Sequence, residues 1–337
     1  MGNAGETVFF RQGSLEGVVR KPVEISEALS AKMANMSFFA SMLVVLMHAV
    51  GKDEIATGSS VEVFVHWVRN VLTYSAVPYF FLASGFFLAR HFVEIGWWKI
   101  ELNKRVRSLL VPYLIWVAIG IVFANENLIT SIGLTFAPPK PTHIWFLRAL
   151  MILVLISPVV ALAVRKWSLG VLCLCSLLAA SFIFEQNHFL PWLGVFCFVF
   201  GGFIRFYPIA LDKTATRITL IIIALLALSL TLLSQLNVRG GGVVVPLAAL
   251  LTLWIIMPAI RLPKMLTSLA FPIYLIHPFI YFGLFKGEAL LGFKNYSGSH
   301  LSVHLLFFIM AFGVSLLIGL VLKRYFPRIA SLVFGGR

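Results

Sequence analysis

The chain has 337 residues, of which 60% are hydrophobic and only 12% are charged, and its mean hydropathy is +0.96. This composition excludes an ordinary soluble globular protein and indicates that lipid is the solvent for most of the chain. The net charge of +14 is distributed between apolar runs instead of gathering on one soluble basic face, which argues against nucleic-acid binding.

Apolar runs of roughly 17–25 residues are long enough to cross ~30 Å of hydrocarbon as helices. Such runs recur along the whole chain, and their continuous Leu, Ile and Phe content favours helices over the alternating strands of a barrel. We therefore expect an all-α, polytopic membrane protein, a bundle of about ten transmembrane helices. The predicted spans are 34–50, 71–90, 109–126, 144–164, 167–184, 192–207, 217–236, 243–260, 266–285 and 303–322.

The basic residues predict the orientation, because Lys and Arg are retained on the cytoplasmic side of a membrane. With the N-terminus inside, twenty of the 27 basic residues fall in inner segments, six fall in outer segments and Arg148 falls within a span. Both termini are therefore predicted to be cytoplasmic. We expect an N-terminal cytosolic segment (1–32), a single transmembrane domain (33–325) whose first span is retained as an anchor, and a cytosolic tail (326–337).

The first span ends on an imidazole, His48. An ionisable group inside a bilayer is costly, so it indicates a functional site by default. Imidazole has an ordinary pKa near 6.5, which suits a general base that removes a proton from a hydroxyl. The alternative is a structural histidine hydrogen-bonded to a neighbouring helix carbonyl.

The second and third spans carry a small-residue pair and a basic stretch. Ser84 and Gly85 favour close helix packing, with a slot for a bound chain as the alternative. Lys104, Arg105 and Arg107 precede the third span, where cations at an inner mouth would suit phosphate groups. On a helix, positions 104 and 107 share a face while 105 points away, so only part of the trio is expected to reach a ligand. The alternative is that all three anchor the topology.

Two further candidates lie in later spans. Arg148 sits roughly 6 Å inside the fourth span, where a cation costs up to ~3 kcal/mol, so it should line a polar cavity and contact a substrate or a developing oxyanion. The alternative is snorkelling to the outer interface. His277 lies between Pro272 and Pro278, in a helix whose hydrogen-bond ladder we expect to be interrupted twice. His277 shares the outer half with His48 and Arg148, so the three can converge; a structural role is its alternative.

Five segments taken together resemble the acyltransferase-3 family of bacterial integral membrane O-acyltransferases, and their order and spacing match over nearly the whole chain. One departure from the family pattern is Ser37, because an Arg or Lys commonly stands eleven residues before the histidine of the first span. The segments are MLVVLMHAV (Met42–Val50), VLTYSAVPYFFLASGFFLAR (Val71–Arg90), KRVRSLLVPYLIW (Lys104–Trp116), HIWFLRALMILVLISP (His143–Pro158) and SLAFPIYLIHPF (Ser268–Phe279).

The resemblance implies transfer of an acyl group, usually acetyl, from cytosolic acyl-CoA to a hydroxyl of a cell-envelope or exported carbohydrate, in the bacterial inner membrane. His48 would then be the general base, Arg148 and His277 would bind the acceptor, and Lys104, Arg105 and Arg107 would bind the donor. We expect acyl-CoA as a donor substrate, no tightly bound cofactor, no metal, a carbohydrate or lipid-linked glycan as acceptor, contact with membrane lipids and no nucleic acid.

A second function class is a transporter or flippase for a lipid-linked glycan, because broken helices and intramembrane charges also mark substrate pathways. The sequence shows neither inverted repeats nor a carboxylate in the middle of a span, which argues against it. A non-catalytic assembly protein is a third class, and Ser37 is its best support. Cys173, Cys175 and Cys197 lie in apolar runs without metal-ligand spacing and are expected to be packing residues.

Overall fold

The structure is a computed structural model, and it describes residues 21–49, 72–124, 144–184, 191–208, 221, 241–290 and 301–336. Every regular element in these ranges is helical, which confirms the all-α prediction for the described part of the chain. The predicted span 217–236 lies outside the described residues apart from Ile221. The outer ends of the first three predicted spans also lie outside them.

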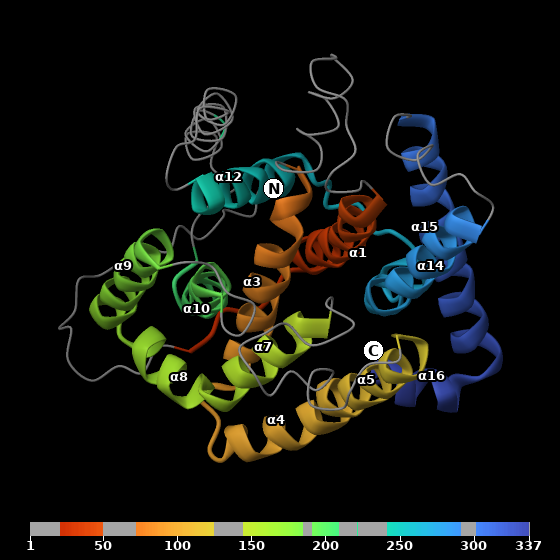
Figure 1. Ribbon diagram of the computed structural model, residues 1–337. Helices are drawn as coiled ribbons and strands as arrows, with labels where there is room; N and C mark the ends of the chain where they lie inside the picture. The colour runs from red at the N-terminus through yellow and green to blue at the C-terminus, as the bar shows by residue number, and fades with distance from the viewer. Residues whose placement is uncertain are drawn as a thin grey trace, which may run out of the picture.

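The described helices form a bundle, in which a central row of apolar helices is flanked by shorter ones (Figure 1). Its main helices are α1 (Glu27–Ala49), α3 (Ala76–Leu88), α4 (Trp97–Arg105), α5 (Val111–Ala124), α7 (Trp145–Leu155), α8 (Ser157–Arg165), α9 (Trp167–Ile183), α10 (Trp192–Phe206), α12 (Gly241–Ile256), α14 (Ala270–Leu290), α15 (Leu301–Tyr325) and α16 (Pro327–Phe334). Short turns join them: η2 (Thr73–Ser75), η3 (Ala89–His91), the π-helical η4 (Val106–Leu110) and α13 (Lys264–Thr267).

Six helices pack side by side in a row that runs from α9 through α10, α3, α1 and α14 to α15. Figure 1 shows α9 and α10 on one side, α14 and α15 on the other, and α1 and α3 between them. The row is held by two apolar clusters, a large one around α1, α3, α7 and α10 and a smaller one where α1 meets α14 and α15. This arrangement places α1, which carries His48, in the centre of the row.

The closest contact in the row is the crossing of α3 and α10. A Cβ on Gly85 would collide with the backbone carbonyl of Phe198, and a Cβ on Gly201 would collide with the carbonyl of Leu82. Only glycine permits this approach, as is usual for small residues at membrane helix interfaces. Gly85 therefore has the packing role that we expected, and it holds the wall that α3 contributes to the site below.

Among the described residues, three helices are long and apolar enough to cross a membrane: Glu27–Ala49, Trp97–Val122 and Val303–Tyr325. A fourth is obtained if the bent pair α7 and α8 is counted as one span. Helices α9, α10 and α12 are apolar but shorter. The structure thus supports a membrane protein, while the number of ten spans and the cytoplasmic termini stay predictions.

The predicted span 144–164 consists of two helices, because α7 and α8 meet at a bend of 60°. Pro158 causes the break: its ring cannot approach the carbonyl of Val154, four residues earlier, and it has no N–H to donate. The freed Val154 carbonyl instead accepts hydrogen bonds from Ser157 Oγ at 2.6 Å and from Trp98 Nε1 at 3.3 Å. The bend therefore also ties α7 to α4.

The segment predicted as a tail contains helix α16, which packs on α5 and α15. Its Phe334 is fully buried, and Trp116 Nε1 of α5 donates to the carbonyl of Val333 at 3.1 Å. Gly335 ends the helix with a φ of 69°, close to the backbone of Ser108, where a side chain would not fit. The end of the chain is thus part of the packed bundle.

Candidate functional site

A cavity of about 410 Å³ lies in the middle of the bundle, between α1, α3, α7, α10 and the α13–α14 junction. We refer to it as the central cavity. Its size is that of a small-molecule site, which typically measures about 300–1,000 Å³. It is lined by Ser37, Phe80, Ala83, Ser84, Phe87, Leu88, Arg90, Arg105, Leu109, Phe146, Leu150, Val154, Phe198, Thr267, Ser268, Ala270, Phe271 and Tyr274.

The charged lining of the central cavity consists of two arginines, Arg90 and Arg105. Arg90 ends the second predicted span and Arg105 precedes the third, and both lie on the side predicted to be cytoplasmic. A third cation approaches the same mouth, because Lys323 Nζ of α15 donates to the carbonyl of the lining residue Ser268 at 2.7 Å. The inner mouth is therefore basic, whereas the deeper wall is aromatic and apolar.

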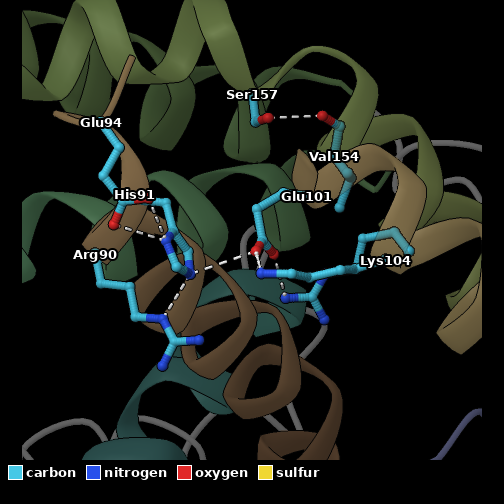
Figure 2. Close-up of polar contacts among 8 residues, drawn as sticks. Arg90, His91, Glu94, Glu101, Lys104, Val154 and Ser157 are labelled. Atoms are coloured by element: carbon cyan, nitrogen blue, oxygen red, sulfur yellow. Dashed lines mark hydrogen bonds and ion pairs between the residues drawn. The ribbon is translucent and has the colours of Figure 1, made fainter. Parts of the chain in front are cut away.

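A buried carboxylate, Glu101, binds the basic side chains on one side of this mouth (Figure 2). Its side chain is only 3% exposed, and it accepts hydrogen bonds from Lys104 Nζ at 2.7 Å and from Arg105 at 3.3 Å. The carboxylate also lies 3.4 Å from Nε2 of His91. A buried charge needs such partners, and here they fix the Arg105 guanidinium beside the cavity.

His91 links Glu101 to the second arginine of the mouth. Arg90 Nε donates to His91 Nε2 at 2.7 Å, while His91 Nδ1 lies 3.0 Å from both carboxylate oxygens of Glu94. The His91 ring therefore lies between the Arg90 guanidinium and the Glu94 carboxylate. Figure 2 shows Arg90, His91, Glu94, Glu101 and Lys104 as one connected group.

The structure separates the predicted trio Lys104, Arg105 and Arg107. Arg105, the member that points away from the other two, lines the central cavity. Lys104 is 57% exposed, is paired with Glu101 and is not part of the lining, and Arg107 is exposed on the surface. The expectation that only part of the trio faces the cavity thus agrees with the geometry, although the sequence could not say which part.

Ser37, at the position where the resemblance led us to expect a cation, lines the central cavity. Its Oγ donates to the carbonyl of Met33 at 2.9 Å and lies 3.1 Å from the hydroxyl of Tyr79. The Tyr79 hydroxyl donates to the same Met33 carbonyl. The position therefore faces the cavity, but its hydroxyl is engaged in a link between α1 and α3.

An aromatic path leads from the central cavity toward the predicted catalytic residue. Phe146 of α7 lies 5.9 Å, centroid to centroid, from both Phe80 and Tyr274, and all three line the cavity. Tyr274 in turn lies 6.4 Å from the ring of His277, one turn further along α14. The cavity therefore ends one helical turn from a histidine.

His277 and His48 come together, as their shared depth suggested. Their ring centroids are 5.3 Å apart, with the planes tilted by 32°. His277 is fully buried and its Nδ1 lies 3.1 Å from the carbonyl of Ile273, whereas His48 is exposed. One side of the exposed His48 ring thus rests against His277.

Further contacts fix the end of α1 that carries His48. Tyr281 donates its hydroxyl to the carbonyl of Val45 at 3.0 Å, and His304 of α15 lies with Nδ1 3.0 Å from the carbonyl of Ala49. Both residues are buried. The Ala49 carbonyl is one of the last four that a helix leaves unpaired, so His304 closes the end of α1, while Tyr281 adds a second contact to its backbone at Val45.

The helix that carries His277 is less broken than the sequence suggested. Pro272 is the third residue of α14, so its missing N–H falls among those that a helix leaves unpaired anyway. Pro278 alone lies in the helix interior, and it removes the bond to the carbonyl of Tyr274. The two predicted interruptions are therefore one.

Arg148 lies in α7 and is 7% exposed, which argues against the snorkelling alternative. Its guanidinium lies near Tyr113 of α5. Helix α5 in turn contacts α14, because the ring of Trp116 lies 5.1 Å from that of Phe279. Arg148 is therefore placed where α7 approaches α5, and it does not line the central cavity.

Arg90, Glu101 and His304 are the site residues that sequence reasoning missed. Arg90 is one of the basic residues that predict the orientation, and Glu101 precedes the third predicted span. Glu101 stands three and four residues before Lys104 and Arg105, and this helical spacing of opposite charges was the available signal. His304 carried no such signal, because its partner Ala49 is distant in the sequence.

Among the described residues, no group of three or more His, Cys, Asp or Glu side chains could hold a metal ion. The three cysteines are unpaired and distributed over α9 and α10. The polar groups that do gather, at the basic mouth and at the histidine pair, are suited to binding an anion and to accepting a proton.

A comparison with known families finds a match over most of the chain. The family model, described as an acyltransferase domain and belonging to the acyltransferase-3 family, matches residues 35–324. No curated protein and no solved structure matches the chain. The matched region begins two residues before Ser37 and includes both histidines and both arginines of the mouth.

Proposed function

Because the chain belongs to the acyltransferase-3 family, we propose that it is a multi-pass O-acyltransferase of a bacterial inner membrane. It transfers an acyl group, in the first instance acetyl, from cytosolic acyl-CoA to a hydroxyl of a cell-envelope or exported carbohydrate. The observation that carries this proposal is the His48–His277 pair, at 5.3 Å, at the end of an aromatic path from a cavity with a basic mouth.

The donor side of the reaction is assigned to the mouth of the central cavity. The nucleotide phosphates of acyl-CoA bind Arg90 and Arg105, since guanidinium groups form paired, charge-assisted hydrogen bonds with phosphate. The pantetheine arm extends through the apolar part of the cavity beside Ser84 and Tyr274 and delivers the thioester toward His48. Ser37 of the cavity wall and His48 are eleven residues apart on α1, about 16 Å of helix, which is the distance that the arm must cover.

The chemical step is assigned to His48. Its ring accepts the proton of the acceptor hydroxyl as the alcohol oxygen attacks the thioester carbonyl, and the tetrahedral intermediate then releases coenzyme A as the carbon–sulfur bond breaks. His277 orients and supports the His48 ring from the buried side. Arg148 contributes positive charge where α7 approaches α5, and there it favours an acceptor oxygen or the oxyanion.

A transporter or flippase would use the same kind of buried polar groups. The family match favours the enzyme, since the matched domain is an acyltransferase domain. The basic mouth also suits a nucleotide donor better than a lipid-linked sugar, because it offers several cations to several phosphates.

The test uses membranes that contain the full chain, incubated with acetyl-CoA labelled in the acetyl group. Label is expected in a carbohydrate fraction, and only when this protein is present. A matched control supplies acetate of the same specific activity without coenzyme A. Label that never reaches carbohydrate in the presence of acetyl-CoA would contradict the assigned activity, and label retained on the protein would indicate an acyl-enzyme instead of direct transfer.

A further inference from the structure

A second cavity lies beside the first, on the opposite side of α3. It has a volume of about 380 Å³ and is bounded by α1, α3, α10, α12 and the residues before α1. We refer to it as the apolar cavity, because its walls are formed by side chains such as Leu29, Leu82, Phe196, Phe200 and Leu250. The function proposed above does not use it.

One buried cation stands at the inner end of the apolar cavity. Arg205 is 7% exposed, and its Nε has no hydrogen-bond partner among the residues that the structure describes. Its guanidinium lies 5.0 Å from the centre of the Phe86 ring. A buried guanidinium nitrogen that lacks an acceptor is costly, so the Nε side of Arg205 is complementary to an anion.

The charges around Arg205 favour an anion from outside the bundle. Arg90 repels the guanidinium, and the carboxylate that attracts it, Glu24, is exposed at the rim of the cavity. A further cation, Lys32, lies with Nζ 4.7 Å from the centre of the ring of the lining residue Trp254. Within the part of the chain that the structure describes, the charge near Arg205 is therefore mainly positive.

The length of the apolar cavity matches a hydrocarbon chain of one bilayer leaflet. Its lining on α10 extends from Arg205 to Phe196, nine residues or about 13 Å of helix. One leaflet contributes about 15 Å to the hydrocarbon of a typical bilayer. A chain whose anionic head lies at Arg205 would therefore reach nearly to the middle of the membrane.

We propose that the apolar cavity binds one acyl chain of an anionic phospholipid from the inner leaflet, with the lipid phosphate against Arg205. Basic pockets between transmembrane helices on the cytoplasmic side bind anionic lipid headgroups in this manner. The lipid supplies the missing acceptor for the guanidinium and fills the space beside α3. Since the opposite face of α3 lines the central cavity, the bound chain also supports the wall of the candidate active site.

The test is mass spectrometry of the intact, purified full chain in detergent, after equilibration with phosphatidylglycerol or with phosphatidylcholine. The wild-type protein is expected to retain one phosphatidylglycerol. Arg205→Gln removes the charge, and Leu247→Trp fills the cavity, so each is expected to weaken retention by about tenfold. Arg165→Gln is the matched control, because Arg165 lies at the same end of the bundle, also has an Nε without a partner among the described residues, and does not line the cavity.

Three results would overturn the proposal. Equal retention by the wild-type protein, Arg205→Gln and Leu247→Trp would show that the lipid binds elsewhere. Equal retention of phosphatidylcholine would show that Arg205 does not select an anion. Displacement of the retained lipid by an equimolar amount of long-chain acyl-CoA would assign the cavity to the donor. The thermal stability of each variant in the same detergent distinguishes lost binding from lost folding, and Leu247→Trp tests the cavity even where Arg205→Gln fails to fold.

Discussion

Replacement of Arg105 by glutamine is expected to weaken donor binding, while the same change at neighbouring cations has little effect. Arg105 lines the central cavity with its side chain 27% exposed, and Glu101 holds it there. A hydrogen bond to a charged group contributes about 1.5–3 kcal/mol, which corresponds to about 10- to 150-fold in an equilibrium constant. Because Arg105 already has a carboxylate partner and is partly hydrated, we expect the lower end, a KM for acetyl-CoA raised about tenfold.

Two matched variants separate this effect from a general loss of charge. Arg107→Gln removes the same charge from an exposed position, and Lys104→Gln removes a 57% exposed partner of Glu101. Exposed ion pairs typically contribute about 0.2–1 kcal/mol, so each should change the KM by less than about fivefold. The assay is the initial rate of label transfer against acetyl-CoA concentration, in membranes with equal amounts of each protein.

The KM of Arg107→Gln shows whether the donor binds at a specific site or is attracted by the overall positive charge of this surface. An equal rise in KM for Arg105→Gln and Arg107→Gln would mean that the overall positive charge attracts the donor. An unchanged KM for Arg105→Gln would remove the mouth of the central cavity from the donor site. A rise confined to Arg105, with kcat little changed, is the outcome that the geometry predicts.

Three other substitutions test separate parts of the structure. Gly201→Ala should destabilise the protein by about 1–3 kcal/mol, because the new Cβ meets the carbonyl of Leu82. Gly283→Ala is the control, because Gly283 has open space around it. Equal Tm values of the two variants in detergent would refute the close crossing of α3 and α10. Ser37→Arg places a cation in the central cavity and should lower the KM for acetyl-CoA severalfold, and an unchanged KM would show that the donor does not reach this wall. His277→Phe keeps an aromatic ring against His48 but removes both nitrogens, so kcat should fall while the KM for acetyl-CoA is preserved. An unchanged kcat would show that His277 only packs against His48.

The fold class could be predicted from sequence because apolar content and run length depend only on the solvent of each segment. The bend between α7 and α8 could also have been predicted, since Pro158 lies inside the predicted span and its consequence at Val154 is local. The path of the last residues could not, because α16 is fixed by Trp116 and Ser108, which lie more than 200 residues earlier.

The candidate site was predictable in its composition but not in its geometry. Membrane depth suggested that His48 and His277 could meet, and they do. Helical spacing separated Arg105 from Lys104 and Arg107, but which face turns toward the cavity depends on how α4 and η4 pack on α7. Arg90 was overlooked because a cation at the end of a span is explained by topology alone, and only tertiary structure places it beside Arg105.

The most direct test of the central claim is acyl transfer by His48→Ala in membranes, measured with labelled acetyl-CoA beside wild type and His304→Ala. His304 is the control because its buried imidazole contacts the backbone of Ala49 at the same end of α1 and takes no proton in the proposed step. General acid–base catalysis typically contributes about 10²–10⁴-fold, so His48→Ala should lose at least about 100-fold in rate at wild-type protein levels and Tm, while His304→Ala should lose less than about tenfold. Transfer at the wild-type rate by a folded His48→Ala protein would contradict the account.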